Sequence, residues 1–162
     1  CHRRVEAMPV EVPELTPEEG RKLAARAWVS GLYATVGFLA ERLGPEAISD
    51  YSRYSARLAA LQLRQAGVSD SLSFALANAT LFKNAYGSEV EVSGGPEEAE
   101  LRLVRCANLE AALELAERGL PVERERHCAG CLNYMRALAE ELGLELSGQL
   151  TEKGCTMKVR RR

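Results

Sequence analysis

The sequence predicts an α+β domain in which three N-terminal helices precede a β-β-α-α-β-β arrangement. Three observations lead to this fold class. Apolar residues recur at helical spacing through the first half of the chain, the pattern changes to strand-like alternation near residue 89, and two more helical segments separate two hairpin patterns. We therefore expect an antiparallel four-stranded sheet with helices on one face, joined to an N-terminal helical layer.

The first predicted helix starts at Thr16 and ends at Leu43. Thr16 can cap it, Pro17 suits the first helical position, Glu19 completes a capping box, and Gly44 is the stop signal. The apolar stripe expected to face the core of the protein consists of Leu23, Ala27, Gly31, Ala34 and Phe38.

Two further helices complete the predicted helical layer, residues 16–87. One runs from Pro45 to about Gly67 and the other from Ser71 to Tyr86. Their expected core positions are Ile48, Tyr51, Tyr54, Leu58 and Leu61 in the first, and Leu72, Leu76, Ala79 and Phe82 in the second. Residues 1–15 contain two prolines and no helical periodicity, so we expect a flexible arm there.

The predicted sheet and its helices occupy residues 88–162, the cysteine-rich part. Alternating patterns predict one hairpin around the turn SGGPEE and another around TEKG. The predicted strands are 89–92, 99–105, 144–150 and 155–161, and the predicted helices are 107–119 and 128–142. Residues 16–162 are together long enough for a single α+β domain with its own core.

Composition excludes several function classes. Acidic residues (23) nearly balance basic ones (21), which gives a net charge of −2 and no general attraction to nucleic acid or to an anionic membrane. The most apolar stretch is interrupted by Gly31 and Gly37, so we expect no membrane partner. The N-terminal residues lack the apolar centre of a signal peptide, and a cytoplasmic location is the expectation.

Four of the five cysteines lie in the last 57 residues, at predicted element boundaries. Cys106 follows a strand, Cys128 and Cys131 open a helix as a CxxC pair, and Cys155 follows a tight turn. Thiols stay reduced in the cytoplasm, so grouped cysteines there indicate metal binding or redox chemistry rather than disulfides. Only one CxxC pair is present, which weakens the resemblance to a zinc ribbon, but the positions at element ends predict that at least three of the four cysteines share one metal, with zinc as first choice.

Several alternatives remain open for these residues. The thiolates could hold an iron–sulfur cluster, the CxxC could be a redox dithiol, or the cysteines could be small buried hydrophobic residues. His127 could replace a sulfur ligand or donate a hydrogen bond to one, although a lone histidine beside Arg126 is more often simply exposed. If only three cysteines bind zinc, the open position could activate water with help from His127 or Glu125.

The order of elements, with VRC ending a strand, a cysteine pair opening a helix and GC before the last strand, resembles a known group of domains. It is similar to 4-vinyl-reductase (hydrocarbon-binding) domains and to L-2-amino-thiazoline-4-carboxylic acid hydrolase-like proteins, over roughly Pro17 to Arg161. The resemblance implies zinc held by Cys106, Cys128, Cys131 and Cys155 beside a pocket for a small, often apolar molecule. In that group an acidic residue or a single cysteine often stands where this chain has CAGC.

These observations lead to three functional hypotheses. The first is a cytoplasmic, sensor-like domain that binds a small, possibly apolar molecule and carries a structural zinc site. The second is a zinc-dependent hydrolase with an open metal position, and the third is an iron–sulfur or dithiol redox protein. Whether the chain is an enzyme is left open. A homodimer is a possible assembly.

Overall fold

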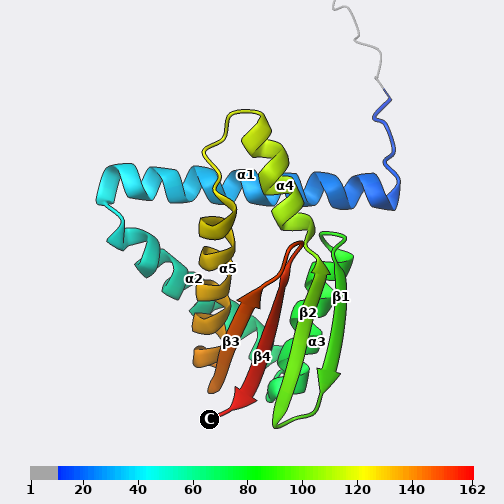
Figure 1. Ribbon diagram of the computed structural model, residues 1–162, viewed down its shortest axis with the longest axis vertical. Helices are drawn as coiled ribbons and strands as arrows, with labels where there is room; N and C mark the ends of the chain where they lie inside the picture. Colours follow the sequence, from blue (N-terminus) through cyan, green and yellow to red (C-terminus); the bar gives the residue numbers. More distant parts are fainter. Residues whose placement is uncertain (1–10) are drawn as a thin grey trace, which may run out of the picture.

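The computed structural model describes residues 11–162, and within this range it contains five helices and four strands (Figure 1). The helices are α1 (Pro17–Leu43), α2 (Glu46–Gln65), α3 (Ser71–Asn84), α4 (Ala107–Glu117) and α5 (Arg124–Glu141), and the strands are β1 (Glu89–Gly94), β2 (Glu98–Arg105), β3 (Leu144–Leu150) and β4 (Cys155–Arg161). The predicted α+β class is confirmed. Most of the predicted arm, including Cys1 and His2, lies outside the described residues, while residues 11–15 are exposed and have no regular structure.

The four strands form one antiparallel sheet in the order β1-β2-β4-β3. The last strand of the chain, β4, therefore lies in the middle, where Leu101 of β2 pairs with Met157 and Leu146 of β3 pairs with Val159. Alternate residues of the strands point into the core. The buried set is Ala99, Leu101, Leu103, Leu144, Leu146, Cys155, Met157 and Val159.

Helices cover only one face of this sheet. Helix α3 packs on β1 and β2, helix α5 packs on β3, and both contribute side chains to the core that the sheet residues form. The other face carries charged cross-strand pairs such as Arg160–Glu145 at 2.9 Å and Arg102–Glu91 at 3.5 Å. Such a division is common in antiparallel sheets, whose uncovered face can remain in water.

Helices α1, α2 and α4 lie outside this first helical layer. Helix α2 packs on α5, and α1 crosses α4 and contacts α2 (Figure 1). A second, smaller core joins α1 to α4 through Ala25, Val29, Ala111 and Ala112. Helix α1 thus crosses beyond one end of the sheet, and α2 lies behind α5 in this view (Figure 1).

The predicted capping box of α1 is confirmed. The backbone N–H of Glu19 donates to the Thr16 hydroxyl at 3.3 Å, and the backbone N–H of Thr16 donates to the Glu19 carboxylate at 2.8 Å. These two bonds satisfy N–H groups that have no partner inside the helix. A capping box formed by Asp70 and Ser73 also begins α3.

The apolar stripes predicted to face the core in α1 and α2 are wrong. The α1 stripe is exposed, and the buried residues of this helix are Ala25 and Val29 on another side. In α2, the buried residues are Ala56 and Ala60, whereas most of the predicted positions, Tyr51, Tyr54, Leu58 and Leu61, face solvent. Periodicity shows that a helix has an apolar side, but it does not show what covers that side.

We expect the stability of α3 to depend on pH through its cap. The backbone N–H of Ser73 holds the pKa of Asp70 below its ordinary value of 3.8. A lowered pKa in the folded state means that the stabilisation is complete above about pH 3.8 and is lost as the pH falls through the folded-state pKa. In Asp70→Asn the cap stays but cannot titrate. Urea unfolding between pH 6 and pH 3 should therefore show a smaller loss of stability in Asp70→Asn than in the wild type, and equal losses would contradict the assignment.

Candidate metal centre

The four cysteines predicted to act together lie at one end of the sheet. Cys106 is the cap residue between β2 and α4, and Cys155 is the first residue of β4. Cys155 pairs with Leu103 on one side and Leu150 on the other, so it lies between the ends of β2 and β3. Cys128 and Cys131 both lie on α5, which packs against this sheet. The fold therefore brings three separate segments of the chain to this place.

The structure corrects the predicted position of the CxxC pair on its helix. Helix α5 begins at Arg124, so Cys128 is its fifth residue and lies in the second turn rather than at the N-terminus. Cys128 and Cys131 are three residues apart and share one face of the helix. The first-turn N–H groups are therefore not available to favour thiolates at these two positions.

The thiols are close enough to influence one another electrostatically. Burial is the main reason why the pKa of each thiol is raised, and it raises the pKa of Cys155 to about 12. Charge on Cys106 raises the pKa of the other three, and charge on Cys128 raises those of Cys131 and Cys155. Burial therefore favours the protonated form of all four thiols, and a thiolate at one position makes ionisation of its neighbours harder.

Cys106 differs from the other three because of its position before α4. The backbone N–H groups of Leu109 and Asn108 favour its thiolate and partly offset the effect of burial on its pKa. A side chain at this position can accept hydrogen bonds from the free N–H groups of a helix start. Among the four, Cys106 is thus the cysteine whose pKa nearby backbone N–H groups lower, and its thiol makes no cap hydrogen bond in this structure.

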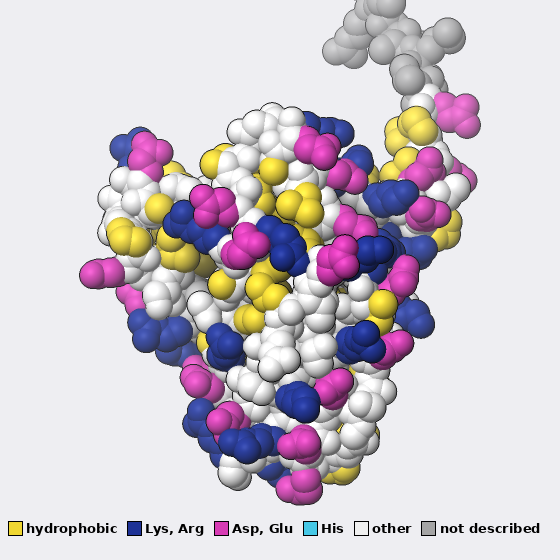
Figure 2. All heavy atoms as spheres, viewed as in Figure 1, with side chains coloured by type: hydrophobic (Ala, Val, Ile, Leu, Met, Phe, Trp, Pro, Cys, Tyr) yellow, Lys and Arg dark blue, Asp and Glu magenta, His cyan; other side chains and the backbone are white. Residues whose placement is uncertain are grey.

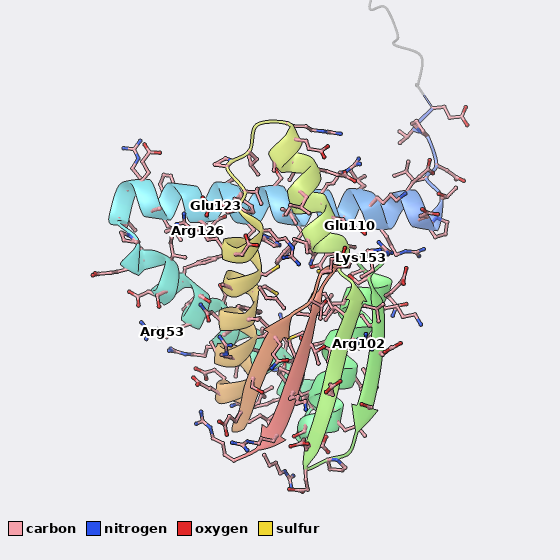
Figure 3. All side chains as sticks on the ribbon, in the orientation of Figure 1. Arg53, Arg102, Glu110, Glu123, Arg126 and Lys153 are labelled. Carbon is pink, nitrogen blue, oxygen red and sulfur yellow. The ribbon has the colours of Figure 1, made fainter. Side chains whose placement is uncertain are left out.

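Backbone hydrogen bonds hold the segments of this cluster together. The N–H of Cys106 donates to the carbonyl of Lys153 at 2.8 Å, and the N–H of Ala107 donates to the buried Ser88 hydroxyl at 3.0 Å. Figure 3 labels Lys153 at the β3–β4 turn, Glu110 on α4, and Glu123 and Arg126 at the start of α5. The start of α4 is therefore attached directly to the turn that precedes Cys155.

Arg124 attaches the start of α5 to the same turn. Its guanidinium donates to the carbonyl of Glu152 at 2.8 Å and also to the carbonyl of Thr151. An arginine at the start of a helix gives no sequence signal for such a contact, and our sequence analysis did not identify it. Together with the Cys106–Lys153 bond, it makes the β3–β4 turn the common anchor of α4 and α5.

Gly154 is required for the close packing of this turn. A Cβ atom on Gly154 would lie 2.1 Å from the carbonyl oxygen of Leu103, a distance that real contacts do not allow. Any other residue would push the turn away from β2 and move Cys155 with it. The glycine before the last strand is therefore a condition for the cysteine cluster.

His127 is engaged elsewhere. Its ring stacks on Tyr33 of α1, with centroids 5.9 Å apart and planes at 6°, and its Nδ1 lies 3.3 Å from the Tyr33 hydroxyl. Burial lowers the pKa of His127 and favours the neutral ring. Glu125, the other residue considered as a catalytic assistant, is exposed and lies 3.7 Å from Arg124. Neither contact involves a cysteine.

One buried polar atom close to the cluster in sequence lacks a partner. Within residues 11–162, the side-chain oxygen of Asn108 is buried without any hydrogen-bond donor. Asn108 lies two residues after Cys106, in the first turn of α4. An unpaired buried acceptor costs about 1–3 kcal/mol.

The surface hollows lie away from the space predicted to hold an apolar ligand. A groove of about 450 Å³ runs between α1 and α4 and is lined mainly by charged side chains, including Arg21, Arg105 and Glu110. A hollow of about 240 Å³ lies on the open, charged face of the sheet. Between α3, α5 and the sheet, the aromatic and aliphatic residues form the core. Hydrophobic side chains also gather on the surface where α1, α4 and α5 meet (Figure 2).

Comparison with protein-family models, with curated proteins and with solved structures finds no match for this chain. Its functional interpretation therefore depends on the cysteine cluster itself. Two features of that cluster bear on its chemistry: the raised pKa values bear on nucleophilic reactivity, and the grouping of the thiols bears on metal binding. Raised pKa values make the thiols poor nucleophiles at neutral pH, because the thiolate is the reactive form. The grouping of four thiols is, however, the donor set that zinc or an iron–sulfur cluster uses.

We expect Arg124→Met to loosen the anchor at the β3–β4 turn. Loss of two hydrogen bonds from a charged donor should lower the free energy of unfolding by about 1–3 kcal/mol. The matched control is Arg126→Met, because Arg126 is an exposed arginine two residues away on the same helix, and its change should stay within about 0.5 kcal/mol. Urea unfolding of both variants measures the difference, and equal stabilities would contradict the role of Arg124.

Proposed function

We propose that the chain is a small α+β metal-binding domain in which Cys106, Cys128, Cys131 and Cys155 hold one zinc ion. The observation that supports this best is the meeting of three distant segments, each bringing cysteine, at one end of the sheet. Clustered thiols in a chain that forms its own core need no disulfide to fold. A shared dication would favour the thiolate forms, which burial and the charge of neighbouring thiolates otherwise disfavour.

The donor set fits zinc in its chemistry, but the side chains are not in ligand positions. Within residues 11–162, no three His, Cys, Asp or Glu side chains form a group that could hold a metal ion as they stand. Cysteine has a single χ1 angle with three staggered positions, so rotation of these side chains can redirect the sulfurs without moving the backbone. Binding therefore requires these cysteine side chains to change their χ1 rotamers.

A structural role is favoured over a catalytic one. Bound zinc would supply positive charge and four strong bonds that join α4, α5 and β4, which are linked otherwise by the Cys106–Lys153 bond and by Arg124. His127 is occupied by Tyr33, and Glu125 faces solvent. A hydrolase with an open zinc position remains the second prediction, and an iron–sulfur or dithiol redox protein the third.

Metal analysis of the full chain tests the proposal. Protein purified quickly under reducing conditions should contain one zinc per chain and show no visible absorbance. Cobalt substitution should produce the intense absorption bands of cobalt–thiolate bonds. A brown protein with iron and sulfide would overturn the zinc assignment in favour of a cluster. Metal-free protein that also fails to bind added zinc or cobalt would overturn metal binding altogether.

Binding of a small apolar molecule, the cytoplasmic location and the resemblance to 4-vinyl-reductase domains stay predictions. Neither of the two hollows described above suits a hydrophobic ligand, because their linings are charged or polar, and core residues fill the space between α3, α5 and the sheet. A ligand of the α1–α4 groove would instead need charged groups of its own. Binding of a hydrophobic fluorescent dye, with and without metal, distinguishes these cases.

A further inference from the structure

The longest helix of the molecule leaves an apolar side uncovered. Helix α1 has 27 residues and by length and composition could span a membrane. Of the residues in its most apolar window, 11% are buried inside the protein, so most of that window is uncovered. Leu23 is 57% exposed and Phe38 is 61% exposed. Between them on the same stripe lie Ala27, Gly31 and Ala34, all exposed. Isolated apolar residues on a surface are ordinary, but a continuous stripe indicates an interaction site.

A second uncovered stripe lies on α2. Tyr51, Tyr54, Leu58 and Leu61 are exposed, and Tyr54 and Leu58 have exposed fractions of 58% and 45%. Their separations of three, four and three residues are those of a helix face that packs against another helix. The side of α2 that is covered carries the smaller residues Ala56 and Ala60.

Both stripes face the same side of the molecule. Helix α4 packs on α1 and helix α5 packs on α2, and both covering helices lie on the near side in Figure 1. The uncovered sides of α1 and α2 therefore point together to the far side. Since α1 and α2 also contact each other, their stripes can act as one surface.

We propose that the chain forms a homodimer through the outward faces of α1 and α2, with the two copies of α1 packed antiparallel about a two-fold axis near Ser30 and Gly31. The α1 stripe is self-complementary in this arrangement. Its large residues stand at the two ends and its small residues in the middle, so Leu23 meets Phe38 of the second copy and the small residues allow the helix backbones to approach closely.

The helix dipoles favour an antiparallel pair. Both ends of α1 carry mixed charge: Glu18 already pairs with Lys22 at 2.9 Å, and Glu41 precedes Arg42. The charged residues therefore do not select an orientation. In an antiparallel pair the two helix dipoles oppose each other favourably, whereas a parallel copy would place like dipole ends together.

The available area suits a dimer of ordinary size. A helix rises about 1.5 Å per residue and is about 10 Å wide, so the faces of α1 and α2 together cover roughly 700 Å². A standard interface buries about 800 Å² on each partner. The α1 face alone would fall clearly short of this, which is why the proposal includes α2.

A membrane is less suited to this surface than a second copy. Helix α1 is attached along its side to α4, and Arg26 of α1 forms an ion pair with Glu114 of α4 at 2.6 Å. Insertion across a bilayer would carry these charges and α4 with it, which is costly in hydrocarbon. The charges near the stripe are of both signs, so they provide no net attraction to an anionic lipid surface.

The test is the mass of the full chain in solution, measured by light scattering after size exclusion. The wild type should have twice the mass of the chain, and Gly31→Glu and Leu58→Glu should have the mass of a monomer. A Cβ atom on Gly31 meets nothing within 4 Å, so Gly31→Glu should leave the monomer fold intact. Two like charges near the axis should raise the dimer Kd by at least about 100-fold.

The matched control is Leu113→Glu, which changes an apolar residue of similar exposure on α4, outside the proposed interface. It should remain a dimer, and circular dichroism should show all three variants folded. Wild-type monomer at high concentration would overturn the proposal, as would dimers that survive both interface substitutions. Flotation of the wild type with lipid vesicles, abolished by Leu58→Glu, would assign the surface to membranes instead.

Discussion

Replacing Cys155 by serine is expected to remove the bound metal and to loosen the C-terminal half of the chain. Cys155 lies between the ends of β2 and β3, and its neighbour Lys153 holds the start of α4. Loss of a residue that merely orients a metal ligand typically costs 10- to 100-fold in affinity, so loss of a ligand itself should cost at least about 100-fold. Structural zinc contributes directly to folding free energy, and a chelator should therefore lower the melting temperature of the wild type.

The measurements are zinc content by mass spectrometry and thermal unfolding with and without chelator. Cys1→Ser is the matched control, because Cys1 is the remaining cysteine and is not predicted to bind metal. It should keep one zinc per chain and the melting temperature of the wild type. If Cys155→Ser kept its zinc and its sensitivity to chelator, a closed four-cysteine site would be excluded, and the three-cysteine site with an open position would become the better interpretation.

Phe74→Ala should produce the largest loss of stability among single core substitutions in α3. The Phe74 side chain is 1% exposed and belongs to the core formed by α3, α5 and the sheet. Its removal leaves a cavity that close-packed neighbours can fill only in part, and such changes cost about 3–5 kcal/mol. Against a total stability of about 5–15 kcal/mol, this could leave the domain barely folded.

Urea unfolding of Leu81→Ala provides the comparison for Phe74→Ala. Leu81 lies on the same helix and is 49% exposed. Its truncation should change the free energy of unfolding by no more than about 0.5 kcal/mol. Similar effects of the two substitutions would mean that α3 does not pack on the sheet through Phe74.

The helices show where sequence reasoning succeeded and where it stopped. Capping residues and glycine stops located α1 and α3 closely because these signals act locally, through backbone N–H groups and positive φ angles. The core faces of α1 and α2 were wrong because both helices carry apolar residues on more than one side. Small alanines and a valine meet α4 and α5, and the larger residues are left outside.

For the cysteines, too, sequence reasoning predicted some features and missed others. Spacing indicated that four thiols lie at element ends, and the antiparallel hairpins indicated that those ends could meet. Sequence reasoning placed the CxxC at a helix start, whereas α5 begins four residues earlier, at Arg124. It missed the contact of Arg124 with the β3–β4 turn, because a long side chain can reach many partners and sequence does not select among them.

By itself, the sequence determined the fold class and the order and approximate bounds of the elements. These properties depend on local backbone preferences and on the period of apolar residues. Only the tertiary structure decided that β4 lies between β2 and β3, that the larger apolar sides of α1 and α2 remain uncovered, and that His127 packs on Tyr33. These depend on contacts between distant segments, which are set by how all the elements pack together rather than by any one of them.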